Sequence, residues 1–166
     1  MSDTRDLLAR IDSAERTLSH FAETPPPPSA LTRAEPSTGE RWDAGQAWAH
    51  LAEFVPYWRM EARRVADPAN AEPVAFGRVQ SDPDRIARIA EGRREPPPVQ
   101  MERLARELSA LRSWLTGLAP ADLQRMGIHQ TRGPMSVREI IDRFIAAHLE
   151  EHAAQLGELE MPEARR

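Results

Sequence analysis

Residues 146–156 read AAHLEEHAAQL, and their centre places His148 and His152 four positions apart. Because an α-helix completes a turn in about 3.6 residues, two side chains at this spacing project from one face and can chelate one metal ion. Imidazole nitrogens are common ligands of zinc and of other transition metals. The histidine pair is therefore a candidate for part of a metal site.

The letters H-x-x-E-H are also the signature of the inverted zinc metallopeptidases. Those enzymes are larger α+β proteins in which a distant downstream carboxylate completes the site. Here Glu158 and Glu160 follow His152 closely, and they are predicted on the same helix as the histidines. The Glu-x-x-His motif of di-iron bundles occurs nowhere in the chain. We therefore expect neither a peptidase nor a di-iron site.

A third histidine, His50, also replaces an apolar residue in a helical stripe. It lies about 10 Å inside the second predicted helix, and the midpoint of His148 and His152 lies about 15 Å from a helix end near residue 160, at about 1.5 Å per residue. Antiparallel packing of these helices would bring the three imidazoles within about one turn of the same level. The alternative for each histidine alone is a hydrogen-bonded core residue.

The other two histidines are expected outside this site. His20 falls on the solvent side of the first predicted helix. His129, in GIHQTRGP, is predicted in a loop at the opposite end of the bundle, in a loop or capping role.

Four segments have the apolar period of a helix, and they cover residues 4–22, 44–66, 99–118 and 136 to about 160. Asp43 with Gln46, and Ser136 with Glu139, have the spacing of capping boxes that start the second and fourth helices. Pro162 is expected to end the fourth helix.

The connections between these helices set the expected topology. The connection 67–98 contains a short helix capped by Asp82, and it is long enough to cross the bundle, so the second and third long helices can run parallel. No strand is predicted. The sequence thus predicts an all-α, up-down-down-up four-helix bundle with a long crossover between helices 2 and 3.

The composition agrees with one globular domain over residues 1–166, since 40% of the residues are hydrophobic and 29% are charged. A net charge of −4 gives no basic surface for nucleic acid. No signal peptide or membrane span is visible, so we expect a cytoplasmic protein. The chain has no cysteine, and any thiol nucleophile must therefore come from a cosubstrate.

Four segments together, RWDAGQAWAHLAEFVPYW, DPDRIARI, GIHQTRGPMSVREII and AAHLEEHAAQL, resemble the DinB-like superfamily. Its members are up-down-down-up helical bundles that include bacillithiol transferases and mycothiol-dependent maleylpyruvate isomerases. The resemblance covers residues 4–158, and its most specific element is a histidine early in the second helix followed by H-x-x-x-H late in the fourth. It implies that His50, His148 and His152 are the metal ligands.

Three neutral imidazoles leave open positions for water or substrate, as in a catalytic site. The ion, zinc or nickel first and iron next, would keep its full charge, lower the pKa of a bound thiol or water and polarise a carbonyl. Gln155 and Glu151 are the candidates to orient an imidazole or to accept a proton. Trp48, Tyr57 and Trp58 are expected in the core or along a pocket, and the PPPP and PPP segments are expected to roof the site.

The sequence therefore predicts a metal-dependent transferase, isomerase or hydrolase that activates an external thiol or water for reaction with a small-molecule substrate. A homodimer is the expected assembly. Two other functions stay open: a non-catalytic helical structural or interaction protein, with or without a metal, and a sensor of metal or stress.

Overall fold

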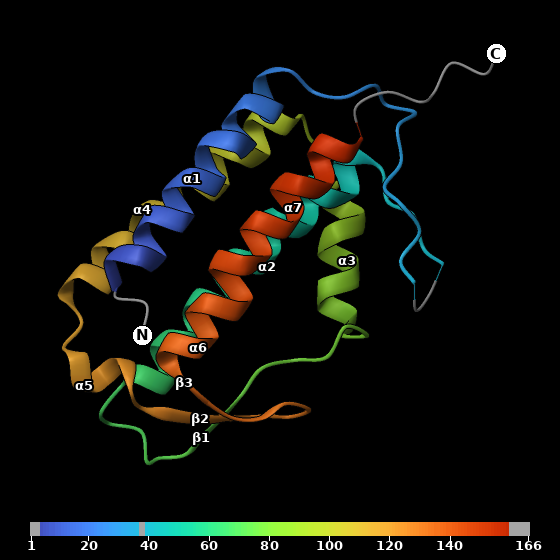
Figure 1. Cartoon of the computed structure of the whole chain (residues 1–166). Coiled ribbons are helices and arrows are strands. Elements are labelled where there is room, and N and C mark those ends of the chain that lie inside the picture. Colours follow the sequence, from blue (N-terminus) through green and yellow to red (C-terminus); the bar gives the residue numbers. More distant parts are fainter. Residues whose placement is uncertain (1–3, 37–38, 160–166) are drawn as a thin grey trace.

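The computed structural model describes residues 4–36 and 39–159 and forms a bundle of four long helices (Figure 1). The helices are α1 (Thr4–Glu23), α2 (Ala44–Ala66), α4 (Pro97–Gly117) and a last helix made of α6 (Val137–Ile141), the π-helical segment η1 (Asp142–Ala146) and α7 (Ala147–Glu158). In Figure 1, α1 and the last helix run one way while α2 and α4 run the other way. This confirms the up-down-down-up bundle.

The predicted helix starts are present at atomic detail. The Asp43 side chain accepts a hydrogen bond from the backbone nitrogen of Gln46, and the Gln46 side chain accepts one from the backbone nitrogen of Asp43. Ser136 and Glu139 make the same reciprocal pair at the start of α6. Each pair satisfies backbone donors that the first turn of a helix leaves unpaired. The two helices that carry the candidate metal ligands therefore have fixed starting points.

Leucine and isoleucine side chains fill the space between the helices. Leucines that recur at successive turns of α4 are almost fully buried, and they pack with residues of α1 and of the last helix: Leu7, Ile11, Leu18, Leu104, Leu108, Leu111, Leu115, Ile141 and Ile145. Trp48 is also fully buried in this core rather than along a pocket.

The expectation of no strand was wrong. A three-stranded sheet closes one end of the bundle, with β1 (Val74–Phe76) parallel to β2 (Met126–His129) and β2 antiparallel to β3 (Gly133–Ser136). Strands of three or four residues are too short for alternation to be recognised in a sequence. The β1–β2 pairing also joins segments that lie far apart in the chain, and Gly127 allows the close approach because a β-carbon there would meet Phe76 at 2.6 Å.

The crossover from α2 to α4 contains β1 and then α3 (Pro83–Gly92), which packs against α2 (Figure 1). The Asp82 side chain caps α3 by accepting from the backbone nitrogen of Arg85, as predicted. A further short helix, α5 (Pro120–Leu123), leads from α4 to the sheet. The last helix ends at Glu158, and Pro162 lies outside the described residues. No described helix is long and apolar enough to cross a membrane.

Candidate metal centre

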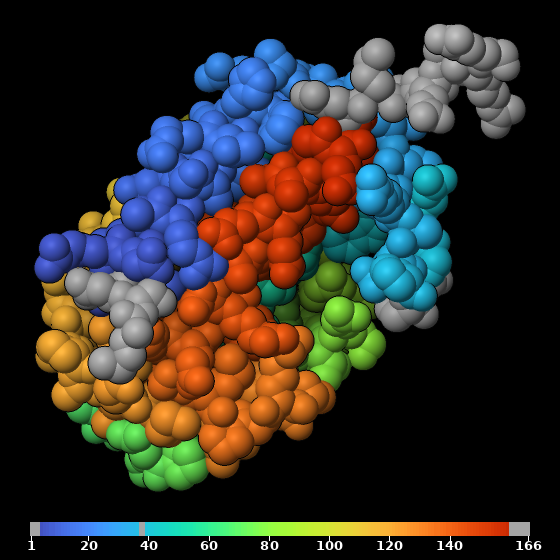
Figure 2. Space-filling model, in the orientation of Figure 1, coloured from blue at the N-terminus to red at the C-terminus, as the bar shows by residue number. Residues whose placement is uncertain are grey.

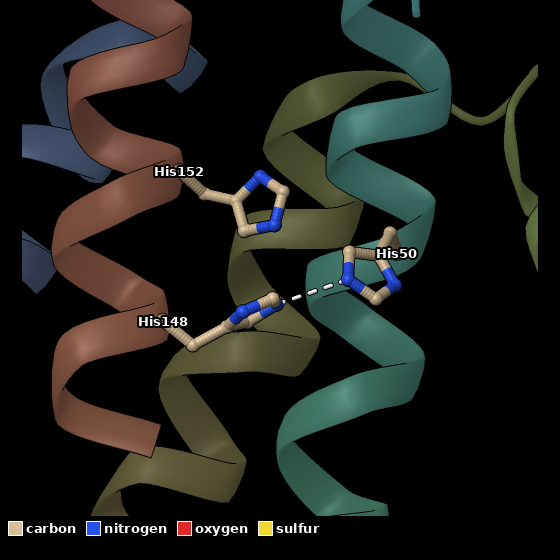
Figure 3. A group of neighbouring side chains, drawn as sticks. All are labelled: His50, His148 and His152. Atoms are coloured by element: carbon tan, nitrogen blue, oxygen red, sulfur yellow. Dashed lines mark hydrogen bonds between the residues drawn. The ribbon is translucent and has the colours of Figure 1, made fainter. Parts of the chain in front are cut away.

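Three histidine side chains from two helices meet at one point (Figure 3). His50 comes from the second turn of α2, and His148 and His152 point toward it from successive turns of α7. One ligand nitrogen of each ring lies within 4.8 Å of those of the other two. The ring planes cross at 67° to 84°. The structure therefore brings together the three residues that the sequence singled out.

The spacing of these nitrogens fits a shared cation. Zinc–imidazole bonds of about 2.0–2.1 Å place tetrahedral ligand nitrogens roughly 3.3 Å apart. The Nε2 atoms of His50 and His148 are 2.9 Å apart, so a small outward rotation of either ring would make room for an ion. Without an ion, these two nitrogens can form a hydrogen bond only if one of them carries the proton. A cation would instead accept lone pairs from both.

Gln155 orients one of the rings. Its Oε1 lies 2.7 Å from Nδ1 of His152, so the Nδ1–H of His152 donates to Gln155 and the Nε2 lone pair is free to bind a metal. The Glu151 carboxylate is 3.9 Å from Nδ1 of His148, which is beyond hydrogen-bond range, and its side chain is 75% exposed. The structure thus places Gln155 against an imidazole and Glu151 at the solvent.

All three imidazoles are held in the neutral form that binds metals. Burial lowers the pKa of His50 and of His148 well below the ordinary value, and the charge of a protonated His152 would lower both further. Burial also lowers the pKa of His152 to about 4, although its hydrogen bond with Gln155 opposes the shift. At pH 7 these rings can therefore bind a cation without first losing a proton.

Sequence reasoning missed one carboxylate at this centre. Glu53 lies one turn beyond His50, is buried, and has its Oε1 3.7 Å from Nδ1 of His50. Arg78 holds it with hydrogen bonds of 2.5 and 2.7 Å from Nη2 to the two carboxylate oxygens. The signal was present, because Glu53 follows His50 at the same three-residue spacing that relates Gln155 to His152.

The three histidines line a cavity of about 1230 Å³. Its walls come from the segment before α2, from α2 and α3, from the β2–β3 hairpin, and from η1 and α7. Figure 2 shows the surface hollowed between α7, in red and orange, the light-blue segment before α2 and the green α3. The candidate metal centre is therefore open to small molecules.

Stacked aromatic rings extend from the histidines along the cavity. The His148 ring stacks on Phe54 at a centroid distance of 3.7 Å, and Trp58 stacks on Phe144 at 3.8 Å. Phe54 and Trp58 are 5.7 Å apart and join the two pairs. Tyr57 lies outside the lining, under the guanidinium of Arg78. Of the three predicted pocket aromatics, only Trp58 reaches the cavity.

His129 was placed wrongly by the sequence. It ends β2 and is a buried strand residue rather than part of a loop, and it lines the same cavity as the three histidines. Its Nδ1 accepts a hydrogen bond from the backbone nitrogen of Thr131, and its ring lies 5.8 Å from Trp58. The strand was not recognised, and so its last residue was assigned to the wrong surroundings. His20 is exposed, as expected.

The proline segments shape the cavity less directly than expected. The lining includes Thr32 and Trp42 from the segment that follows PPPP, but none of the four prolines. The PPP segment is the start of α4, where Pro97 and Pro98 occupy the first helical positions. Residues of the segment after PPPP, within 32–35 and 40–42, therefore line the cavity where the prolines were expected.

Charged side chains of both signs line the cavity. Six arginines and three glutamates are among its lining residues. Three of these arginines, Arg33, Arg78 and Arg93, pair with carboxylates that lie outside the lining. Arg85 reaches the region of the histidines, since its charge contributes to the lowered pKa of all three, and its Nη1 donates to the carbonyl of Gln80. Arg85 therefore places a positive charge near the candidate metal ligands.

Comparisons with known proteins agree with the family resemblance and with the helical-bundle fold. The DinB superfamily model matches residues 10–156. One similar solved structure is YfiT from Bacillus subtilis, which is described as a probable metal-dependent hydrolase with an unusual four-helix bundle topology. The TM-score is 0.75 at 16% sequence identity, and the match covers 96% of this chain and 87% of YfiT. The mycothiol-dependent maleylpyruvate isomerase is similar at a TM-score of 0.63 and 17% identity, over 95% of this chain and 64% of the isomerase. No curated protein sequence matches.

Proposed function

The chain belongs to the DinB superfamily, and from this premise we propose that it is a metal-dependent enzyme acting on a small molecule at the three-histidine centre. The observation that carries the proposal is the meeting of three neutral imidazoles at the wall of an open cavity. A structural metal would be enclosed by four protein ligands, whereas three ligands facing a cavity are typical of a catalytic site.

In this proposal His50, His148 and His152 hold the cation, and Gln155 fixes the tautomer of His152. Zinc or nickel is the expected ion, and when bound it would act as a Lewis acid that lowers the pKa of a thiol or a water. Glu151 is the candidate proton acceptor, because its carboxylate lies at the cavity beside His148 and is exposed to solvent.

The cavity supports a reaction between two small molecules. Its volume of about 1230 Å³ exceeds the roughly 300–1,000 Å³ of ordinary ligand pockets. Phe54, Trp58 and Phe144 offer flat apolar contact to a substrate, while Arg85 offers a positive charge near the metal centre. Because the chain has no cysteine, we expect a low-molecular-weight thiol as cosubstrate for a transferase, and water as the nucleophile for a hydrolase.

Metal analysis of the purified protein tests the centre itself. After reloading with zinc or nickel, the wild-type protein should hold about one ion per chain. His50→Ala and His148→Ala should hold almost none, and the exposed His20→Ala should match the wild type. Equal metal content in the wild type and in His50→Ala would refute the three-histidine site.

Activity assays then separate the catalytic functions from the others. The loaded protein would be given a panel of small electrophiles with and without an added thiol, and a panel of esters and amides. Thiol-dependent product identifies a transferase, and thiol-independent product identifies a hydrolase. Metal binding without turnover would favour a sensor or a structural metal. Light scattering would test the expected homodimer.

A further inference from the structure

One nitrogen at the candidate centre is buried without a hydrogen-bond partner. This is Nδ1 of His50, in a side chain that is 4% exposed. Buried polar atoms are almost always paired, so an unpaired one requires an explanation. The Oε1 atom of Glu53 is 3.7 Å away, only slightly beyond the range of a hydrogen bond.

Glu53 is itself held where it can serve as a partner. Its side chain is 6% exposed, and Nη2 of Arg78 donates to both of its oxygens. The Arg78 guanidinium lies 3.9 Å above the centre of the Tyr57 ring. The preceding residue, Gly77, is anchored by a hydrogen bond of 2.6 Å from its nitrogen to Glu61. The segment after β1 thus places Arg78 in contact with the Glu53 carboxylate beside His50.

The position of the proton on the His50 ring indicates what this carboxylate does. The Nε2 atoms of His50 and His148 face each other at 2.9 Å, so Nε2 is the atom that His50 presents to the centre. An imidazole that offers a lone pair at Nε2 must carry its proton at Nδ1, and that proton needs an acceptor. His152 has such an acceptor in Gln155. Glu53 is the corresponding group for His50.

We propose that Glu53 is a positioning residue of the metal centre, which accepts the Nδ1 proton of His50 while Arg78 holds the carboxylate in place. The inference rests on the proposed function. Glu53 would fix the tautomer and orientation of His50, and it would place a negative charge next to three neutral ligands. Outer carboxylates of this kind contribute about 10- to 100-fold to metal affinity in other proteins.

Zinc affinity tests the proposal, measured by competition with a chromophoric chelator on the wild type, Glu53→Gln and the control Glu107→Gln. Each variant removes one carboxylate that an arginine of another element holds, Arg78 for Glu53 and Arg59 for Glu107, but of the two only Glu53 lies beside a candidate metal ligand. We expect about 10- to 100-fold weaker zinc binding in Glu53→Gln and less than about threefold in Glu107→Gln. Equal affinities of Glu53→Gln and the wild type would overturn the proposal.

A measurement on the wild type covers the case in which Glu53→Gln does not fold. Nitrogen-15 NMR of the histidine rings should show, on adding zinc, a slowly exchanging proton on Nδ1 of His50. Absence of that proton in the zinc-loaded protein would overturn the role of Glu53 while leaving the metal site intact. If the wild type binds no zinc, the proposed function and this inference both fail.

Discussion

Replacing His50 by leucine should make the metal-free protein more stable. The ring centres of Trp42 and Phe54 lie 5.2 and 4.8 Å from that of His50, and those of His148 and His152 lie at 4.9 and 5.0 Å. Nδ1 of His50 is buried without a hydrogen bond, and such an atom costs about 1–3 kcal/mol of folding free energy. Leucine is of similar size and carries no polar atom.

The gain is reduced by one lost interaction. The hydrogen bond between Nε2 of His50 and Nε2 of His148 contributes about 0.5–1.5 kcal/mol. His148 is 16% exposed at the cavity, so water can replace its lost partner. We therefore expect the free energy of unfolding of His50→Leu to rise by about 1 kcal/mol in the absence of metal.

Zinc should make the wild type more stable than His50→Leu. At a free zinc concentration of about 1,000 times Kd, a ligand that binds only the folded state adds about 4 kcal/mol. The wild type would gain this stabilisation and His50→Leu would not, so the wild type would become more stable by about 3 kcal/mol.

Urea unfolding in EDTA and in buffered zinc measures both effects. The exposed His20→Leu serves as the control and should stay within about 0.5 kcal/mol of the wild type in both conditions. A metal-free His50→Leu that is less stable than the wild type, or that still responds fully to zinc, would refute the reasoning.

Two further predictions concern the hairpin and the helix surface. Gly77→Ala should lower the free energy of unfolding by about 2–4 kcal/mol, because φ is +91° and a β-carbon would lie 2.4 Å from Cδ2 of His129. The control Gly133→Ala has φ +78° and open space around it, so it should lower that free energy by only about 1 kcal/mol. Equal losses in urea unfolding would show that the contact with His129 is unimportant. Glu150→Gln should lose less than about 1 kcal/mol at pH 7, since Arg10 donates two hydrogen bonds to this partly exposed carboxylate. These hydrogen bonds lower the pKa of Glu150, so the stabilisation they give is present above the ordinary pKa of 4.5 and disappears as the pH falls through the lowered pKa. A loss of stability in Glu150→Gln that does not change with pH would contradict this assignment.

The long helices and their starts could be predicted because their signals are local and repeated. Apolar residues recur through several turns, and the side chains of Asp43 and Ser136 pair with backbone nitrogens only three residues away. The three histidines were found in the same way, because each takes the place of an apolar residue in such a stripe.

The remaining features depend on contacts between distant parts of the chain. The sheet exists because β1 pairs with β2 across about fifty residues, and each strand is too short to be recognised alone. His129 was misplaced together with its strand. Glu53 had a local signal in its spacing from His50, but Arg78, which pairs with it, comes from a segment that only the fold brings near.

The π-helical segment η1 changes the direction in which side chains project from the last helix, so residues before and after it do not follow one helical period. A π turn holds an extra residue compared with an α turn, so it offsets the helical positions on its two sides by about 100°. The half before η1 is set by the Ser136 cap and the sheet, while the half after it aims His148 and His152. The offset thus determines which face of α7 the two histidines occupy relative to α6. Removing one residue from 142–146 would restore a regular helix and turn both imidazoles away from His50, although every ligand would still be present.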